Sequence, residues 1–267
     1  MLDPALPAPP VLEVDLGPGV RAAFTGRTGG TSPAPWSGLN LGLGVGDDAG
    51  RVLAHRESVG RWLAAPLVFG TQVHGAGVRV LSRDDRAARL EHGEGAATCG
   101  EHDALVTAQA GLGLGVLVAD CVPVLLADPG ARVVGVVHAG RAGLLAGVVG
   151  AALGALLAQG ARADRVRAVV GPSACGRCYE VPARMREEVA AVRPGTRSTT
   201  SWGTPALDLP AGVVAELRAA GVQEITTTDV CTLEDERFYS HRLASRDGRT
   251  TGRFAGVVAL ERAGARP

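Results

Sequence analysis

Most hydrophobic positions of the chain fall in short runs of leucine and β-branched residues that are bounded by glycine or by charged residues. Runs of this length are typical of strands buried on both faces of a sheet. The pattern therefore predicts a sheet whose two faces are covered. Strands are predicted at residues 21–27, 66–75, 78–82, 102–107, 111–128, 132–140, 165–173, 224–228 and 253–260.

Helical periodicity separates these strands. Val52, Val59 and Leu63 share one face of an amphipathic helix, and an alanine- and leucine-rich helix further along the chain ends at Gly160. Helices are predicted at residues 49–63, 142–159, 182–192 and 210–220. The alternation of strands and helices predicts an α/β fold.

The domain organisation follows from the absence of an internal repeat or a long linker. Residues 1–20 are rich in proline and are predicted to be an extended lead-in. Residues 21–267 are predicted to form a single catalytic domain. Within it, residues 83–102 are charged and show no period, so a surface loop or insertion is expected there.

Composition excludes several classes of protein. The chain has 267 residues, of which 46% are hydrophobic and 20% charged, so it can bury a large core. Its 27 basic residues, all arginine, balance 27 acidic residues, and no basic run is present. We therefore expect no nucleic-acid partner. No apolar run is long enough for a membrane span, and the N-terminus lacks the pattern of a signal peptide.

The five cysteines are too few for a disulfide framework in a chain of this size. They indicate reduced thiols, and hence a cytoplasmic protein in which the thiols are free for nucleophilic or metal chemistry.

Polar residues that interrupt buried strands are the strongest candidates for chemistry, because their burial costs free energy that a packed valine would not. His74 and His138 end two predicted strands, and Cys121 lies inside a third, after Asp120. Two imidazoles and a thiolate suit a catalytic zinc ion with one open position. The same residues also permit a metal-free reading, with Cys121 as nucleophile and His138 as base. A core thiol and capped strand-end histidines are the structural alternative.

Other candidates depend on weaker patterns. A helix is predicted to begin directly after His138, and its free backbone N–H groups near Gly140, together with Arg141, favour an anion. Cys175 and Cys178 form a CxxC motif for which only Cys231 is an obvious further sulfur, so packing thiols are favoured over a structural metal site there.

Several short motifs in a fixed order resemble the YfiH family, also described as laccase-like polyphenol oxidoreductases, peptidoglycan-editing factor and purine nucleoside phosphorylases. The motifs are FTGRTGGTS, SGLNLG, TQVHG, HDALVT, VADCVPVLLAD, VVHAG, GPSACGRCYEV and FYSHR. The resemblance implies a layered α/β/β/α sandwich with mixed sheets. It also implies that His74, Cys121 and His138 are the ligands of a catalytic zinc ion.

The activity implied by the resemblance is phosphorolysis of adenosine, inosine, guanosine and methylthioadenosine, together with adenosine deamination. Purine nucleoside and phosphate are then the partners, and a monomer is expected. Phosphate is predicted to lie near Gly140 and Arg141, with Arg27 or Arg253 countering its charge. The proton donor is left open between Asp120 and Glu180.

One departure from the family affects this prediction. The family usually reads HAGWRG after the last ligand, whereas this chain has Arg141 at the tryptophan position and Ala142 at the arginine position. Either Arg141 replaces the missing arginine or phosphorolysis is weakened. The rival hypotheses are a metal-free cysteine hydrolase or amidase using Cys121 and His138, a copper-dependent polyphenol oxidase, and a non-catalytic binding module stabilised by metal.

Overall fold

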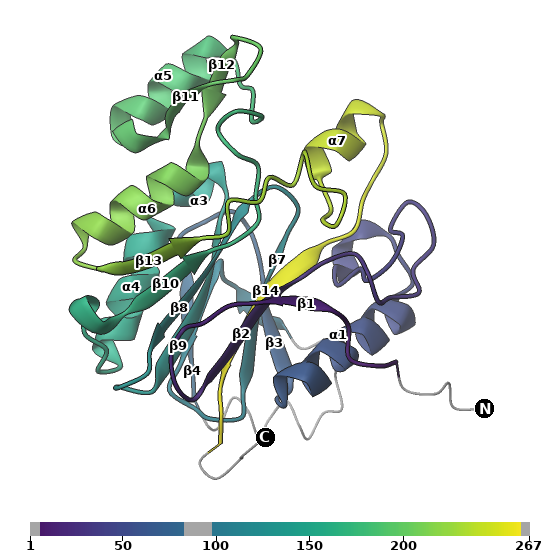
Figure 1. Cartoon of the computed structure of the whole chain (residues 1–267), viewed down its shortest axis with the longest axis vertical. Coiled ribbons are helices and arrows are strands. Elements are labelled where there is room, and N and C mark those ends of the chain that lie inside the picture. Colours follow the sequence, from purple (N-terminus) through teal and green to yellow (C-terminus); the bar gives the residue numbers. More distant parts are fainter. Residues whose placement is uncertain (1–5, 83–97, 263–267) are drawn as a thin grey trace.

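Two mixed β-sheets pack face to face, and helices cover both outer faces (Figure 1). The structure is a computed structural model that describes residues 6–82 and 98–262. In Figure 1, α3, α4 and α6 lie along one side of the sheets and α1 lies along the other. This arrangement confirms the predicted α/β/β/α layering.

Sheet 1 has six strands, antiparallel from β1 to β7 and parallel from β7 to β5. In spatial order these are β1 (Val11–Glu13), β2 (Val20–Thr25), β14 (Phe254–Leu260), β7 (Gly113–Val118), β3 (Leu67–Thr71) and β5 (Thr98–Glu101).

Sheet 2 also has six strands, with parallel pairs at its two edges and antiparallel pairs at its centre. In spatial order these are β13 (Glu224–Thr227), β10 (Arg167–Val170), β8 (Val122–Asp128), β9 (Val133–Ala139), β6 (Ala104–Thr107) and β4 (Val78–Leu81). The short hairpin of β11 (Arg197–Thr199) and β12 (Pro205–Leu207) lies outside both sheets.

The helices differ in length and in what they cover. They are α1 (Ala49–Leu63), α3 (Arg141–Ala146), α4 (Val148–Ala158), α5 (Ala183–Val192), α6 (Leu209–Ala219) and α7 (His241–Arg246). Short 3-10 turns occur at Leu43–Val45, Ala163–Arg165 and Pro194–Thr196. The side chain of Asp48 accepts a hydrogen bond from the Arg51 N–H and so caps the start of α1.

Among the described residues, three of the hydrophobic clusters form layers between the sheets and helices. Phe24, Leu114 and Leu125 are buried between the two sheets. A second layer joins sheet 2 to α4 and α6, and a third joins sheet 1 to α1. The central strands β7, β8, β9 and β14 are therefore covered on both faces, as their uninterrupted apolar runs predict.

Several predicted boundaries are wrong. The helix predicted over residues 142–159 is two helices, because Gly147 adopts the left-handed conformation (φ 85°) that ends α3 and begins α4. The predicted loop at residues 83–102 ends early, since Thr98–Glu101 form β5; residues 83–97 lie outside the described chain. The run at residues 111–128 divides into β7 and β8, which belong to different sheets.

The change of sheet after β7 positions the candidate site. The β7–β8 connection, which contains Cys121, crosses from sheet 1 to sheet 2. Pro123 pairs with His138 in the β8–β9 ladder, so Cys121 lies beside the end of β9. Among the described residues, no helix combines the length and hydrophobicity needed to span a membrane.

Candidate functional site

Three of the predicted site residues meet at one end of the sandwich. His74 follows β3, Cys121 precedes β8, and His138 lies near the end of β9. Their donor atoms all lie within 4.8 Å of one another. Cys121 Sγ is 3.8 Å from His74 Nε2, and the two imidazole rings meet edge to face with centroids 4.8 Å apart. Residues from both sheets thus form one cluster, called here the His/Cys cluster.

The backbone at this cluster is strained. His74 and Asp120 both have positive φ, 58° and 83°, in the left-handed region that non-glycine residues rarely adopt. The Gln72 side chain holds the first turn against β7, because it bonds both the N–H and the C=O of Leu117 at 2.7 Å. Such strain, roughly 1–3 kcal/mol per residue, persists where the surrounding structure fixes the conformation, and it is concentrated at functional sites.

Gly140 gives the cluster room. A Cβ atom at this position would lie 2.7 Å from His74 Cδ2 and 3.1 Å from Cys121 Sγ. Any larger residue would therefore collide with the His74 side chain and crowd that of Cys121. The predicted site residue Gly140 belongs to the cluster through this close backbone approach, and α3 begins directly after it.

Asp103, which precedes β6, holds two residues of the cluster, His74 and His138, through hydrogen bonds. Its side chain is fully buried (0% exposed). It accepts a hydrogen bond from His138 Nδ1 at 2.8 Å and from the backbone N–H groups of Val73, His74 and Gly75 at 3.2, 3.0 and 2.7 Å. One carboxylate thus fixes the turn that carries His74 and the ring of His138. Sequence reasoning missed Asp103, although a charged residue at the start of the buried run HDALVT was a usable signal.

The electrostatics of the cluster favour charge separation. Burial of the Cys121 thiol opposes its ionisation, but hydrogen bonds with His138 and His74 outweigh burial and lower its pKa to about 6. Burial also opposes a charge on His138, yet hydrogen bonds to Asp103 and Cys121 raise its pKa to about 9. Burial of Asp103 is likewise outweighed by hydrogen bonds from His138 and backbone amides, which lower its pKa. Without a metal ion, thiolate and imidazolium therefore coexist at neutral pH.

The donor set fits a zinc-type ion. Because His138 Nδ1 donates to Asp103, its other ring nitrogen faces the cluster, and the loss of the proton from that nitrogen would leave a lone pair for a metal. A tetrahedral zinc ion holds imidazole nitrogen and thiolate sulfur about 3.6 Å apart. The observed Sγ–Nε2 separation is 3.8 Å, so coordination requires only a small adjustment.

Two cavities meet at the His/Cys cluster. The first, the Arg141 pocket, has a volume of about 350 Å³ and is lined by Arg141, Tyr179 and Arg242 as well as by His74 and Cys121. The second, the Arg253 pocket, has a volume of about 420 Å³ and contains Arg56 and Arg253. His241 lines both cavities. The cluster therefore borders both of these cavities, each of which has arginine in its wall.

The three predicted arginines line three different cavities, two of which reach the His/Cys cluster. Arg141 and Arg253 line the two cavities at the cluster. Arg27 stacks on the ring of Tyr239, 4.9 Å from its centroid, and lines a third cavity that lacks the cluster residues. Arg242 was missed by sequence reasoning, because a helix as short as α7 has no readable periodicity; its guanidinium lies over Tyr179 and donates to the Glu180 carbonyl.

The two acids considered as proton donors, Asp120 and Glu180, both accept hydrogen bonds from other protein groups. Asp120 accepts hydrogen bonds from Thr232 Oγ1 at 2.7 Å and from the Arg242 N–H at 2.6 Å. Glu180 accepts from Trp202 Nε1 at 3.1 Å. Asp120 nevertheless lines the Arg141 pocket, whereas Glu180 enters the site through its backbone contact with Arg242.

Comparison with known proteins gives a consistent picture. The family model of multi-copper polyphenol oxidoreductase laccase matches residues 21–261. A purine nucleoside phosphorylase of Streptomyces griseus is 52% identical over 242 residues, covering 90% of this chain and 94% of that protein. One from Streptomyces coelicolor is 49% identical over 249 residues, covering 91% and 96%.

Solved structures agree with these matches. YlmD from Geobacillus stearothermophilus superimposes with a TM-score of 0.82 at 32% identity, over 92% of this chain and 93% of that one. A hypothetical YfiH protein of Bacillus licheniformis gives a TM-score of 0.79 at 30% identity, over 91% and 93%. The resemblance found in the sequence is confirmed, and this chain belongs to the multi-copper polyphenol oxidoreductase laccase family, to which the YfiH proteins are related in fold and sequence.

Proposed function

We propose that the chain is a zinc-dependent purine nucleoside phosphorylase that also deaminates adenosine. The observation that carries the proposal is the His/Cys cluster, three metal-type donors within 4.8 Å of one another, open to two arginine-lined cavities. The names of the relatives from Streptomyces support the reaction. Adenosine, inosine, guanosine and methylthioadenosine are the proposed substrates.

The proposed metal ligands are His74, Cys121 and His138. A zinc ion bound there supplies Lewis acidity to an oxygen of phosphate or of water. The protein contributes the orientation of the ligands: Asp103 fixes the tautomer of His138, and Gly140 keeps the approach to His74 and Cys121 open.

Phosphate is proposed to occupy the Arg141 pocket. Arg141 and Arg242 lie in its wall and can both offer N–H donors to an anion. Ala142 stands at the position where the family usually has arginine. In this proposal Arg141 and Arg242 together supply the positive charge that the missing arginine would have given.

The nucleoside is proposed to occupy the Arg253 pocket, which shares His74, Cys121 and His241 with the Arg141 pocket. A phosphate oxygen then forms a bond to the sugar carbon, the bond from that carbon to the purine nitrogen breaks, and its electron pair leaves with the base. His241, which lines both cavities, is suited to protonate the departing base. In deamination, water attacks the ring carbon that carries the amino group, and ammonia leaves.

A product assay tests this function. Purified protein of known metal content is given adenosine or inosine, with phosphate present or omitted. Adenine plus ribose-1-phosphate from adenosine identifies phosphorolysis, and inosine without phosphate identifies deamination. His74→Ala should abolish both activities. Absence of both products with zinc-loaded protein would refute the proposal.

Arginine variants test the placement of the substrates. Arg141→Gln and Arg242→Gln should raise the KM for phosphate roughly tenfold each, the effect of losing one charged hydrogen bond. Arg253→Gln should instead raise the KM for the nucleoside. Arg246→Gln, in α7 but outside the lining of both cavities, is the matched control and should leave both KM values unchanged. A phosphate KM raised only by Arg253→Gln would reverse the placement.

A second candidate function, a cysteine hydrolase or amidase, has its own supporting observation. Cys121 with a lowered pKa, His138 with a raised pKa and the Asp103 carboxylate behind the imidazole form the order of groups found in cysteine nucleophile sites. Activity that survives complete removal of metal and is lost on alkylation of Cys121 would select this function over the phosphorylase.

Copper-dependent polyphenol oxidation is the third hypothesis, and the family description alone favours it. The His/Cys cluster offers the ligands of one mononuclear site. Copper-loaded protein that oxidises phenols faster than zinc-loaded protein cleaves nucleosides would favour this reading.

A further inference from the structure

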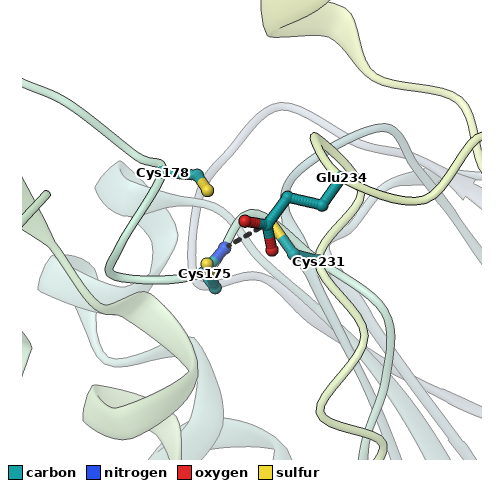
Figure 2. Close-up of side chains that lie close together, drawn as sticks. All are labelled: Cys175, Cys178, Cys231 and Glu234. Atoms are coloured by element: carbon teal, nitrogen blue, oxygen red, sulfur yellow. Dashed lines mark hydrogen bonds between the residues drawn. The ribbon is translucent and has the colours of Figure 1, made fainter. Parts of the chain in front are cut away.

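A second group of metal-type side chains includes Cys175 and Cys178, whose chain neighbours Ala174 and Tyr179 line the Arg141 pocket. The sulfurs of Cys175, Cys178 and Cys231 and a carboxylate oxygen of Glu234 all lie within 4.8 Å of one another. Figure 2 shows the carboxylate of Glu234 beside the three sulfurs. The proposed function uses none of these residues, and the sequence favoured packing thiols here. This group is called the thiol cluster.

The backbone around the thiol cluster is arranged for sulfur ligands. The N–H groups of Cys178 and Tyr179 both donate to the Cys175 carbonyl, at 3.0 and 2.9 Å, which closes the CxxC segment into a tight turn. The Cys175 N–H donates to Cys231 Sγ at 3.5 Å (Figure 2), and the N–H of Leu233 also contacts this sulfur. These N–H groups act to lower the pKa of the Cys231 thiol, but burial outweighs them and raises it, so a negative charge on this sulfur needs a further positive partner such as a metal ion.

We propose that the thiol cluster binds a zinc-class divalent ion through Cys175, Cys178 and Cys231, with Glu234 as fourth ligand. On binding, the three S–H bonds release their protons to solvent as three sulfur–metal bonds form. Tetrahedral bonds of about 2.3 Å place thiolate sulfurs about 3.8 Å apart, so the cluster needs to contract by at most about 1 Å.

Burial supports a structural role for this ion. Cys178 and Cys231 are buried, whereas Glu234 is exposed and also approaches Arg177 at 3.9 Å. Glu234 thus closes the cluster on its solvent side. A site with four protein ligands has no open position for substrate, which is the arrangement of structural rather than catalytic zinc.

The ion would fasten two segments that build the active-site wall. Cys175 and Cys178 lie on the segment that brings Ala174 and Tyr179 into the Arg141 pocket. Cys231 lies on a second segment, whose next residue, Thr232, donates to Asp120 at 2.7 Å, beside Cys121. Metal in the thiol cluster is therefore expected to steady the Cys121 turn and the pocket wall together.

Metal counting tests the proposal without any enzyme assay. Protein expressed with zinc supplied should hold two ions per chain in the wild type and one in either Cys178→Ser or Cys121→Ser. Cys99→Ser removes a thiol outside both clusters and should retain two. A Cys178→Ser protein with the same zinc content as the wild type would overturn the proposal.

Cobalt substitution gives a second measurement that does not need the Cys178→Ser variant, so it can be made even if that variant fails to fold. Co²⁺ bound to Cys121→Ser protein should show a strong sulfur-to-cobalt charge-transfer absorption from three thiolates. Glu234→Gln should keep this absorption but bind Co²⁺ at least roughly tenfold more weakly, because loss of the carboxylate charge should cost no less than loss of a group that only supports a ligand. Absence of the band from Cys121→Ser, or a mass two hydrogens lower that reveals a disulfide within the thiol cluster, would contradict the site.

Discussion

Replacement of Asp103 by asparagine removes one charge and leaves the shape of the side chain. In the native protein this carboxylate accepts hydrogen bonds from His138 Nδ1 and from three backbone N–H groups. Asparagine has one accepting oxygen and one NH₂ group. If the oxygen faces His138, the NH₂ group opposes the backbone donors of the His74 turn. If the NH₂ group faces His138, the imidazole must move its proton to the nitrogen that would bind metal.

The magnitude follows from these two orientations. A buried donor left without an acceptor costs about 1–3 kcal/mol. Loss of the carboxylate behind a metal-binding histidine weakens metal affinity by roughly 10- to 100-fold, or about 1.4–2.8 kcal/mol. We therefore expect Asp103→Asn to weaken zinc binding at the His/Cys cluster by at least roughly tenfold, with a parallel loss of turnover.

A competition titration against a chromophoric zinc chelator measures this affinity. The binding step that is seen in the wild type and missing in His74→Ala protein belongs to the His/Cys cluster. Asp128→Asn is the matched control, because Asp128 is also buried and accepts from the N–H groups of Ala131 and Arg162. It should lower stability and leave the zinc affinity intact. Equal zinc affinities in Asp103→Asn and the wild type would refute the role given to Asp103.

Further predictions concern the approach to the cluster and its charge. Gly140→Ala should lose zinc and activity, because its Cβ would lie 2.7 Å from His74 Cδ2. The control Gly150→Ala, whose Cβ would have no atom within 4 Å, should retain both and gain roughly 0.5–1 kcal/mol of stability. Metal content and thermal unfolding of the two variants test this, and normal zinc content in Gly140→Ala would contradict the packing argument. In metal-stripped protein, Cys121 should be alkylated with a midpoint set by its pKa of about 6, well below the about 8.5 of a free cysteine. Peptide mass spectrometry follows the reaction, and labelling of Cys121 only at the pH of ordinary thiols would contradict the ion pair with His138. Thr232→Val, which removes the hydroxyl donor to Asp120, should loosen the Cys121 turn and lower zinc affinity at the His/Cys cluster, although Thr232 is not one of the three proposed ligands there. Unchanged affinity in the chelator titration would show that the Thr232 segment does not support the Cys121 turn.

The elements that the sequence predicts well are those with a strong local pattern. The helix at residues 49–63 is found at Ala49–Leu63, because Asp48 caps it and its apolar stripe has a clear period. The break at Gly147 has no such signal, since glycine also occurs inside the helical part of the same run, at Gly150 and Gly154. Only the packed structure shows which glycine takes a positive φ.

The candidate site divides in the same way. His74, Cys121 and His138 could be chosen because each interrupts a buried run, but their convergence depends on β7 and β8 lying in different sheets, which no local pattern records. Asp103 and Arg242 act through contacts between distant segments. The sequence favours packing thiols at the thiol cluster for the same reason, because Glu234 has no distinguishing neighbour in the sequence that would add it to the three cysteines.

The most direct test of the His/Cys cluster is anomalous X-ray diffraction from crystals of the protein, recorded at the zinc absorption edge. The account predicts an anomalous peak about 2.0–2.1 Å from a ring nitrogen of His74 and of His138, and about 2.3 Å from Cys121 Sγ. A crystal of active protein without a peak at this position would contradict the central claim that these three side chains hold the catalytic ion.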